Sequence, residues 1–546
     1  MRQNDGVTFT PPPAPSPVPA HRSLPTRTAA AASVIATASS LAVGALVATL
    51  SDGSSPMAIV GRRVVDNVPR WLKEFAISAF GTADKVVLGL CMFAVIAGLG
   101  ALLIKRNSHR PAVLLGAVTA FVAIGVLIAL TGKDPQFGDV LGCLGAGVAA
   151  GAFLLWFTKE APQQSDTPVF SVAPTPMPTP RRWDSGVDRR SFFVKAGAIS
   201  AAGVAAAAVN SSIERSSTST ARARVGRGLP QLIPGTADGP PVLPGSASIG
   251  NGVEPFITPI DRWYRIDTVP FGAPRVDVDT WRLNITGRVD SELSLSYQDL
   301  LDRHIVERVM TLCCVSNEVG GDLISTAVFL GVPLAELLEE AGLAPGAEQV
   351  AMTSHDGWTC GFPTELALDG RDALVALGMN GEPLPVDHGF PARIVVPGLY
   401  GYVSATKWVT EIALTGWDDF DGYWMDKGWS KEGPIKTQSR IDVPRESEVP
   451  PGDVVIAGVA WSQHRGISGV EISIDDGPWM KTSLSTEVTV DAWRQWSYVW
   501  KDAAPGEHEV RVRATDKTGA TQTEQRRPVA PDGATGWHSR RFRVSG

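Results

Sequence analysis

Two adjacent cysteines are the first residues in this chain that could do chemistry. Cys313 and Cys314 lie in the run Thr311–Gly321 (TLCCVSNEVGG), between the apolar segments Ile305–Met310 and Ala327–Leu338. The first segment predicts a strand and the second predicts the start of a helix. A thiolate delivered by a strand end into a glycine-bearing loop suits a soft or high-valent metal. The alternative is a buried structural cysteine, because free cysteine is among the most often buried residue types.

A second stretch carries two cations and a histidine on a backbone fixed by glycine and proline. It runs from Met379 to Gly398 (MNGEPLPVDHGFPARIVVPG) and continues into YVSATKW at residues 402–408. Arg393 and Lys407 can bind phosphate, and His388 can donate a hydrogen bond to the same group. The stretch therefore predicts an anionic ligand. Taken singly, either cation would be interpreted as a solvated surface charge.

Length and charge limit the class of protein. A chain of 546 residues is too long for one hydrophobic core and predicts several domains. The formal net charge of −7 argues against a general nucleic-acid-binding protein, which would present a basic face. The five cysteines are too few for a disulfide framework, and Cys91 and Cys143 are interpreted as packing residues within apolar runs.

The N-terminal part of the chain predicts four transmembrane helices within residues 29–157. Each of four apolar runs approaches the ~20 residues that a membrane-crossing helix needs. The runs are Ala29–Leu50, Val86–Ile104, Ala112–Thr131 and Phe137–Phe157. The short basic loop Lys105–Arg110 should be cytoplasmic by the positive-inside rule. Residues 1–28 are rich in proline, serine and threonine and are expected to be disordered.

Two linkers flank a segment that begins with paired arginines. Residues 158–187 and 211–250 are rich in proline, serine or glycine and predict linkers. Residues 188–210 contain Arg189 and Arg190, then Phe192 and Phe193, then a mildly apolar run. This pattern resembles a twin-arginine export signal. The alternative is an ordinary fifth membrane helix with its arginines in the cytoplasm. Both interpretations place the chain beyond about residue 212 outside the cytoplasm.

Two further domains are expected after the second linker. Residues 251–440 mix helix and strand signals, which predicts an α+β domain. Its expected elements are the strand Val276–Thr286, the helices Leu295–Asp302 and Pro333–Ala341, and the buried strand Ala392–Val396. In residues 441–546 the apolar residues alternate with polar ones, and Asp475-Asp476-Gly477 marks a turn. Several short strands at this spacing predict an antiparallel β-sandwich.

The second stretch resembles the sulfite oxidase family of molybdenum enzymes. The similarity lies in the pattern Asn-Gly-x-x-Leu-Pro-x-x-His-Gly-x-Pro-x-Arg, which begins at Asn380, and in the Val-Pro-Gly and Lys-Trp that follow. The run Cys314–Asn317 (CVSN) is similar to the metal-ligand loop of that family. The resemblance covers about residues 250–546. It implies an α+β molybdopterin-binding oxidoreductase domain and an immunoglobulin-like sandwich, which follow the transmembrane helices that the apolar runs predict.

The resemblance also implies a molybdenum–molybdopterin cofactor and a role for each matching residue. Cys314 would be the catalytic residue and the one protein thiolate on the metal. Cys313 would be structural, because neighbouring strand residues point to opposite faces. Ser354 and Asp356 are alternatives for one contact with the pterin. The implied cofactor-binding residues are Asp261, Tyr264, Arg265, Asn317, Ser354, Asp356, His388, Arg393, Ser404, Thr406 and Lys407.

Two positions depart from the family pattern. Sulfite oxidases have a tyrosine where this chain has Leu377, and a sulfite-binding arginine where it has Val403. Sulfite would therefore lose a hydrogen-bond donor and a cation. The sequence predicts two-electron oxygen-atom transfer on another small-molecule substrate, such as a sulfoxide or N-oxide, by a membrane-anchored, extracytoplasmic enzyme.

Partners are expected as well. They are an unidentified electron-transfer partner, cytochrome or quinone-linked, and a second copy of the chain bound through the C-terminal domain. No nucleic-acid partner is expected. The alternative to an enzyme is a non-catalytic, membrane-tethered binding module that keeps the fold without metal.

Overall fold

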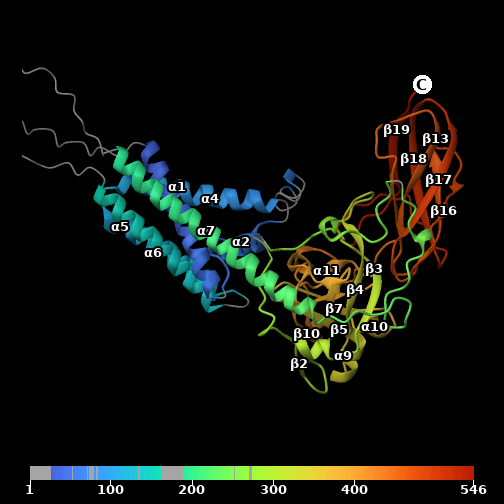
Figure 1. Cartoon of the computed structure of the whole chain (residues 1–546), viewed down its shortest axis with the longest axis horizontal. Coiled ribbons are helices and arrows are strands. Elements are labelled where there is room, and N and C mark those ends of the chain that lie inside the picture. The colour runs from blue at the N-terminus through green and yellow to red at the C-terminus, as the bar shows by residue number, and fades with distance from the viewer. Residues whose placement is uncertain are drawn as a thin grey trace, which may run out of the picture. The chain divides into compact units, whose positions relative to one another are not determined.

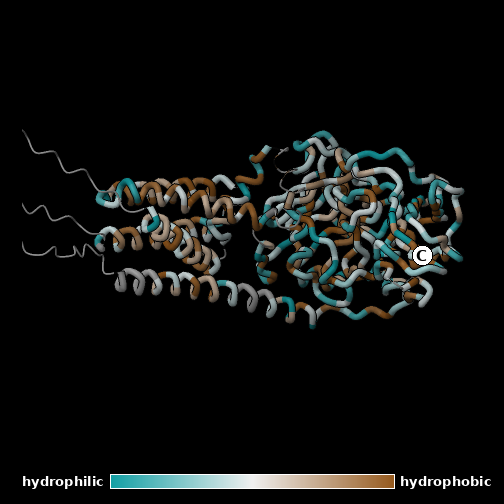
Figure 2. The backbone as a smooth tube through the Cα atoms, turned by 90° about the horizontal axis from the view of Figure 1, so that it is seen from above, coloured by the Kyte–Doolittle hydropathy of each residue, from teal (hydrophilic) through white to brown (hydrophobic). Residues whose placement is uncertain are grey.

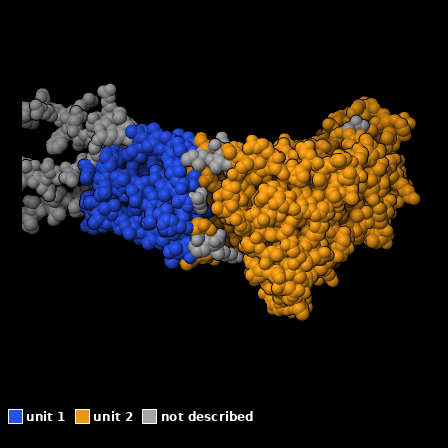
Figure 3. Space-filling model, turned by 60° about the horizontal axis from the view of Figure 1, so that its bottom comes forward, with its two compact units in different colours: residues 1–57, 87–130, 137–209 blue, residues 58–86, 131–136, 210–546 orange. Residues whose placement is uncertain are grey.

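The computed structural model describes residues 26–51, 53–69, 72, 75, 79–80, 84–132, 136–160, 189–250, 252–269 and 273–546. The chain divides into two compact units, coloured separately in Figure 3. One unit comprises residues 1–57, 87–130 and 137–209, and the other comprises residues 58–86, 131–136 and 210–546. Disorder was expected at residues 1–28 and a linker at 158–187. Residues 1–25 and 161–187 lie outside the described residues, whereas residues 26–28 and 158–160 belong to helices and contradict the expectation.

The four apolar runs of the N-terminal part are helices, as predicted. They are α1 (Thr26–Leu50), α4 (Asp84–Asn107), α5 (Pro111–Leu130) and α6 (Phe137–Glu160). Among the described residues these four are long and apolar enough to cross a membrane, and Figure 2 shows their hydrophobic colouring. Glycines let α1 and α6 approach closely, because a Cβ on Gly44 would lie 2.8 Å from that of Ala146. Such small-residue contacts are typical of membrane helix pairs.

Two helices in this part differ from the expectation. The predicted 188–210 segment belongs to α7 (Arg189–Gly226), which continues 16 residues into the stretch that was expected to be a linker. Neither glycine nor proline occurs between Val204 and Val225, so nothing stops the helix before Gly226. A short helix, α2 (Pro56–Asn67), was not predicted.

The domain predicted to be α+β does contain both helices and strands, and it is built on two sheets. One sheet has the order β2-β1-β10-β5-β6, with β1 and β10 parallel, and the other has the order β3-β4-β7-β8, with β9 paired to β7. The first comprises β1 (Arg282–Gly287), β2 (Leu293–Ser296), β5 (Gln349–Ser354), β6 (Thr359–Pro363) and β10 (Val409–Thr415). The second comprises β3 (Val306–Cys313), β4 (Ile324–Pro333), β7 (Leu374–Met379), β8 (Glu382–Pro383) and β9 (Arg393–Val395).

Short helices connect these strands. They are α8 (Tyr297–Leu301), α9 (Leu334–Ala341), α10 (Glu365–Leu368) and α11 (Gly401–Ser404). The prediction that Ala327–Leu338 starts a helix is wrong for its first half, since residues 327–333 belong to β4 and the helix begins at Leu334. Strand β4 is buried on both faces, so its apolar residues form a continuous run that periodicity cannot distinguish from a buried helix.

The C-terminal part is entirely β, and Figure 1 shows its long strands side by side. Its two sheets have the orders β11-β13-β17-β16 and β12-β19-β18-β14-β15. Alternating residues such as Val470, Ile472, Val510 and Val512 form the core between them. The strands are β11 (Gln438–Val443), β12 (Glu448–Val449), β13 (Gly452–Trp461), β14 (Ile467–Ile474), β15 (Met480–Lys481), β16 (Ser483–Leu484), β17 (Arg494–Ala503), β18 (Gly506–Asp516) and β19 (His538–Val544). Its assignment to the immunoglobulin-like class stays a prediction.

Candidate active site

One pocket in the α+β domain collects eight of the predicted site residues. They come from separate loops and strand ends, and the pocket has a volume of about 110 Å³. The eight are Tyr264, Arg265, Cys314, Ser354, Asp356, His388, Arg393 and Lys407. The sheets thus bring together residues that lie far apart in the sequence.

Cys314 enters the pocket directly after β3. Its amide donates to the carbonyl of Leu323 at 2.9 Å, and the Ser316 amide points at its Sγ at 3.4 Å. The side chain lines the pocket although only 8% of the residue is exposed, whereas Cys313 belongs to the hydrophobic core. Burial raises the pKa of the Cys314 thiol, and the Ser316 hydrogen bonds oppose that rise. A bound metal would deprotonate this thiol.

The loop that follows Cys314 is supported by the C-terminal β-sheets. The Asn317 side chain accepts the amide of Leu323 at 2.9 Å and so closes the loop. Arg440 donates to the carbonyl of Gly321 at 2.9 Å. A Cβ on Gly320, which has φ +81°, would lie 2.3 Å from the His538 ring, so only glycine fits against that ring. The loop is therefore positioned from both domains.

Arg393 is the deepest cation of the pocket. Its guanidinium donates to the carbonyl of His388 at 3.2 Å and lies 5.7 Å from the centre of the Trp263 ring. Its Nε is buried and has no hydrogen-bond partner among the described residues. Burial lowers the pKa of Arg393 to about 10. A buried donor without an acceptor is costly, and an anionic ligand would satisfy it.

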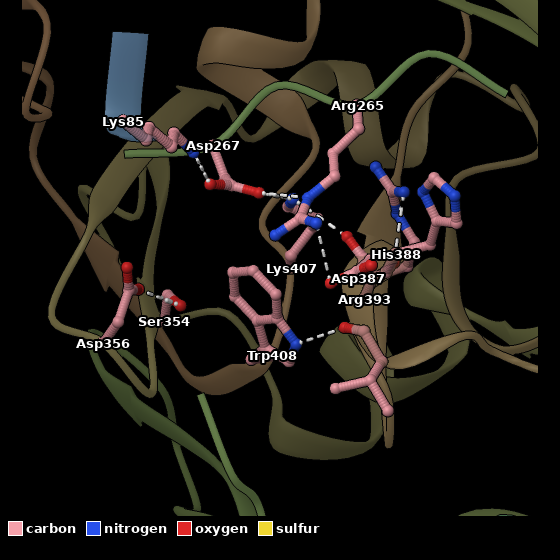
Figure 4. A network of polar contacts seen from close by, with 11 residues as sticks. Lys85, Arg265, Asp267, Ser354, Asp356, Asp387, His388, Arg393, Lys407 and Trp408 are labelled. Carbon is pink, nitrogen blue, oxygen red and sulfur yellow. Dashed lines mark hydrogen bonds and ion pairs between the residues drawn. The ribbon is translucent and has the colours of Figure 1, made fainter. Parts of the chain in front are cut away.

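Lys407 and Arg265 share one carboxylate, Asp267. The distances from Asp267 Oδ2 are 2.9 Å to Lys407 Nζ and 2.9 Å to Arg265 Nε, and Lys85 pairs with the other oxygen (Figure 4). Burial would raise the pKa of Asp267, but these three cations hold it well below its usual range. Burial also lowers the pKa of Lys407 to about 8, although Asp267 opposes that shift. Trp408, with φ +50°, places its ring 4.5 Å from Lys407 Nζ.

His388 stays neutral in this setting. Burial, followed by the charges of Arg393, Lys407 and Arg265, lowers its pKa to about 3. Its ring packs edge-on against Trp263, with centroids 5.4 Å apart. The next residue, Gly389, has φ +113° and lies directly against the backbone of Lys407 and the side chain of Arg393. A glycine thus lets the histidine and the two cations approach one another.

The pocket lining also carries the acid Asp356. Asp356 accepts hydrogen bonds from Ser354 Oγ at 2.6 Å and from the Trp358 amide at 3.4 Å. Both candidates for the further pterin contact, Ser354 and Asp356, thus line the pocket together. Figure 4 shows this pair well separated from Arg393 and His388. Other aromatic residues of the lining are Trp358, Tyr402, Trp424 and Trp429.

Four predicted site residues do not line the pocket. Asp261 is exposed in a short 3-10 turn, and Asn317 closes the cysteine loop. Ser404 donates to the carbonyl of Tyr400 at 3.0 Å, and Thr406 Oγ1 lies 3.1 Å from Cys360 Sγ. Between the last two, Ala405 does line the pocket.

Sequence reasoning missed several pocket residues. The acid Asp267 was not predicted, although it follows Arg265 by two residues and its charge could have signalled an ion pair. The tryptophans Trp263, Trp358, Trp424 and Trp429 carry no spacing that separates a pocket wall from a core. Leu377 and Val403, the two departures noted in the sequence, are buried and do not line the pocket.

Comparison with known proteins agrees with this geometry. Residues 270–424 match the model of a family described as the oxidoreductase molybdopterin binding domain. The chain is 32% identical to human mitochondrial sulfite oxidase over 292 residues, which cover 44% of this chain and 53% of that protein. It is 31% identical to sulfite oxidase from Arabidopsis thaliana over 288 residues, covering 43% of this chain and 72% of the plant protein.

One solved structure is also similar. It is the sulfane dehydrogenase SoxCD from Paracoccus pantotrophus, with 23% identity, a TM-score of 0.46, and coverage of 55% of this chain and 85% of that chain. The chain spans only about half the length of the human relative.

Proposed function

Because the chain belongs to the sulfite oxidase family of molybdopterin-dependent oxidoreductases, we propose that it catalyses two-electron oxygen-atom transfer on a small substrate in the pocket that Cys314 lines. Its cofactor is molybdenum–molybdopterin, the group that the matched domain binds. When bound, this cofactor supplies the redox chemistry, and the protein supplies binding and orientation. The observation that carries the proposal is that Cys314 shares one pocket with His388, Arg393 and Lys407.

The residues of the pocket fit this cofactor. Cys314 offers a thiolate, a donor that soft or high-valent metals prefer. Among the described residues there is no group of three or more His, Cys, Asp or Glu that could hold a metal ion. The remaining metal ligands would therefore come from the cofactor itself. The free Nε of Arg393, with Lys407, Arg265 and neutral His388, suits the phosphate of the pterin.

The proposed substrate is not sulfite. Arg393 and Lys407 would be engaged by the phosphate, and Lys407 and Arg265 already share Asp267. Of the 21 residues that line the pocket, seven are aromatic. Burying an anion there without a partner would cost several kcal/mol, roughly the penalty for an uncompensated polar or charged group. A sulfoxide or an amine N-oxide, which has no net charge, suits this lining better than sulfite does.

The proposed location is the membrane, with the α+β and C-terminal domains outside the cytoplasm. Four helices long and apolar enough to cross a membrane occur among the described residues. Lys105 and Arg106 lie in the last turn of α4, in the basic stretch Lys105–Arg110 that the positive-inside rule assigns to the cytoplasm. The paired arginines at the start of α7 suit twin-arginine export.

The partners proposed for this location are an electron carrier, cytochrome or quinone-linked, and a second copy bound through residues 441–546. A non-catalytic binding module is the competing function. The unsatisfied Nε of Arg393 and the thiol in the pocket argue against it, because a module without cofactor would bury both without use.

The test is a steady-state assay of the purified, molybdenum-loaded full chain. Sulfite is compared with a panel of sulfoxides and N-oxides, using an artificial electron carrier. We expect turnover of a compound without net charge and weak or absent sulfite oxidation. Efficient turnover of sulfite alone would refute the substrate proposal, and a chain without molybdenum would refute the proposed enzyme.

A further inference from the structure

One member of the charge network at the pocket comes from the N-terminal part of the chain. Lys85 is the second residue of α4 (Asp84–Asn107), and it belongs to the same compact unit as the α+β domain. Its ammonium pairs with one carboxylate oxygen of Asp267, whereas Lys407 pairs with the other (Figure 4). Every residue proposed above to bind the cofactor follows residue 250. Lys85 therefore has no role yet in the proposed function.

A second contact joins the stretch between α1 and α4 to the surroundings of the pocket. Asp66, in α2 (Pro56–Asn67), accepts a hydrogen bond from the Tyr423 hydroxyl at 3.1 Å. The Tyr423 ring packs edge-on against Trp424, with centroids 5.2 Å apart, and Trp424 lines the pocket. Asp66 also belongs to the compact unit of the α+β domain. The pairing of Lys85 is thus one of two contacts that hold this stretch against the domain.

The position of Lys85 in α4 agrees with the proposed location of the domain. Lys105 and Arg106 lie in the last turn of this helix, which the positive-inside rule assigns to the cytoplasm. The first turn of a helix that crosses the membrane then lies on the outer side. A lysine at the end of such a helix extends its ammonium towards the water. Lys85 and the α+β domain are therefore expected on the same side of the membrane.

The carboxylate of Asp267 is buried and depends on its cations. Its side chain is only 3% exposed. Burial disfavours its charge, but the charges of Lys407, Lys85 and Arg265 lower its pKa and keep it ionised. Because a buried charge needs compensation, the loss of one cation increases the attraction of Asp267 for those that remain. Without Lys85, Asp267 would hold Lys407 more tightly.

The ammonium of Lys407 divides its hydrogen bonds between the protein and a ligand. It has three N–H donors. It donates to Asp267 Oδ2 at 2.9 Å and to the carbonyl of Asp387 at 3.1 Å. The third donor can bind an anion in the pocket, which then competes with Asp267 for the charge of Lys407. Since Lys85 balances part of the charge of Asp267, it weakens this competition.

We propose that Lys85 is a positioning residue for the cofactor site: it balances part of the charge of Asp267 and so leaves Lys407 able to bind the phosphate of the cofactor. The inference rests on the proposed function, because it takes that phosphate as the ligand of Lys407. Lys85 does not line the pocket and acts through Asp267. The N-terminal part of the chain thus contributes to the cofactor site, in addition to its proposed role as a membrane anchor.

The test measures how fast the purified, molybdenum-loaded full chain loses molybdenum and pterin during dialysis at fixed temperature. Lys85→Gln should lose them about 2- to 5-fold faster than the wild type. This is the range for a solvent-screened ion pair, and the Lys85 side chain is 33% exposed. Lys85→Arg keeps the cation and should restore the wild-type rate. A role of Lys85 in packing alone would not produce this rescue.

The matched control is Arg63→Gln. Arg63 is a cation of α2 that donates to the carbonyl of Thr131 at 3.1 Å and to its hydroxyl at 2.7 Å, and neither residue lines the pocket. This variant removes a positive charge from the same stretch of the chain and should lose the cofactor at the wild-type rate. Melting temperatures are measured for all variants, so that a general loss of stability is recognised.

A double-mutant cycle tests whether Lys85 acts through Asp267. In a chain that carries Asp267→Asn, adding Lys85→Gln should not accelerate the loss of molybdenum further, because the charge that Lys85 balances is absent. An undiminished effect in that background would mean that Lys85 acts on the cofactor directly, and it would overturn the proposal. Where Asp267→Asn holds no molybdenum, the comparison of Lys85→Gln with Lys85→Arg decides the question.

A Lys85→Gln chain that keeps its cofactor as long as the wild type would also overturn the proposal, as would equally fast loss in Lys85→Arg or Arg63→Gln. Failure of the proposed function gives a different result. A wild-type chain that never contains molybdenum refutes the enzyme before any variant is compared. A loaded wild type with an unchanged Lys85→Gln variant refutes the positioning role alone.

Discussion

Replacing Gly389 by alanine should loosen the cofactor without removing any side chain that would bind it. A Cβ at this position would lie 2.9 Å from the Cβ of Arg393 and 3.2 Å from the Cα of Lys407. Carbon atoms in contact prefer separations of about 3.5–4.0 Å, so the nearer pair must separate by roughly 0.5–1 Å. The two cations proposed to hold the phosphate would therefore shift together.

The expected magnitude has two parts. An alanine at φ +113° is strained, and such backbone strain costs about 1–3 kcal/mol of stability. A hydrogen bond to a charged group contributes about 1.5–3 kcal/mol, so misaligning one such bond would weaken cofactor binding by about 10- to 100-fold. We expect the cofactor to dissociate faster by a similar factor, with a lowered melting temperature.

The matched control is Gly370→Ala. Gly370 also has a left-handed φ, +89°, but a Cβ there meets no atom within 4 Å. It should lower the melting temperature through the same backbone strain and leave the rate of cofactor loss unchanged. Both variants are followed by molybdenum and pterin content during dialysis at fixed temperature. Equal rates of loss in the two variants, or a Gly389→Ala protein as slow as the wild type, would refute the reasoning.

Three other outcomes are expected. Cys314→Ser should lose molybdenum in metal analysis, because a hydroxyl is a harder and weaker donor than a thiolate; full molybdenum with unchanged activity would disprove the ligand. Reporter fusions at residue 108 and after residue 546 should give opposite signals, whereas matching signals would exclude the proposed topology; Arg189→Lys with Arg190→Lys should block export only if the twin-arginine interpretation holds. Burial, then Arg440 and Arg540, lowers the pKa of His538 to about 4, and its Nδ1 accepts the Ile441 amide at 2.9 Å. Since the unfolded chain binds the proton more tightly, stability should fall as the pH falls from about 6.5 to 4, by at most about 3 kcal/mol. Thermal melts of wild type and His538→Gln check this, and identical pH dependence would contradict it.

The charged residues of the pocket could be predicted from sequence because they lie in a stretch that contains several prolines and glycines. Proline and glycine fix the backbone around His388 and Arg393, so their spacing carries information. The tryptophans Trp358, Trp424 and Trp429 of the lining could not be predicted, since a tryptophan packs equally well in a core or at a pocket. Asp267 was missed for a different reason: its effect depends on cations that only the fold brings to it.

The secondary structure could also be predicted only in part. The β14 and β18 strands alternate and were predicted correctly, because one face of each is buried and the other is not. Strand β4 is buried on both faces, so its apolar residues do not alternate with polar ones. Helix α7 extends beyond its predicted end because residues 211–225, although rich in serine, contain neither glycine nor proline.

The contacts of His538 and Arg440 with the loop after Cys314 set an order of events during synthesis. The ribosome makes β3 and this loop long before it makes β11 and β19, which carry the two supporting residues. A nascent chain therefore holds the cysteine in a loop that Asn317 closes but that Arg440 and His538 do not yet support. Stable cofactor binding is then expected only after β11 and β19 are made, and a chain truncated before β19 should hold less molybdenum.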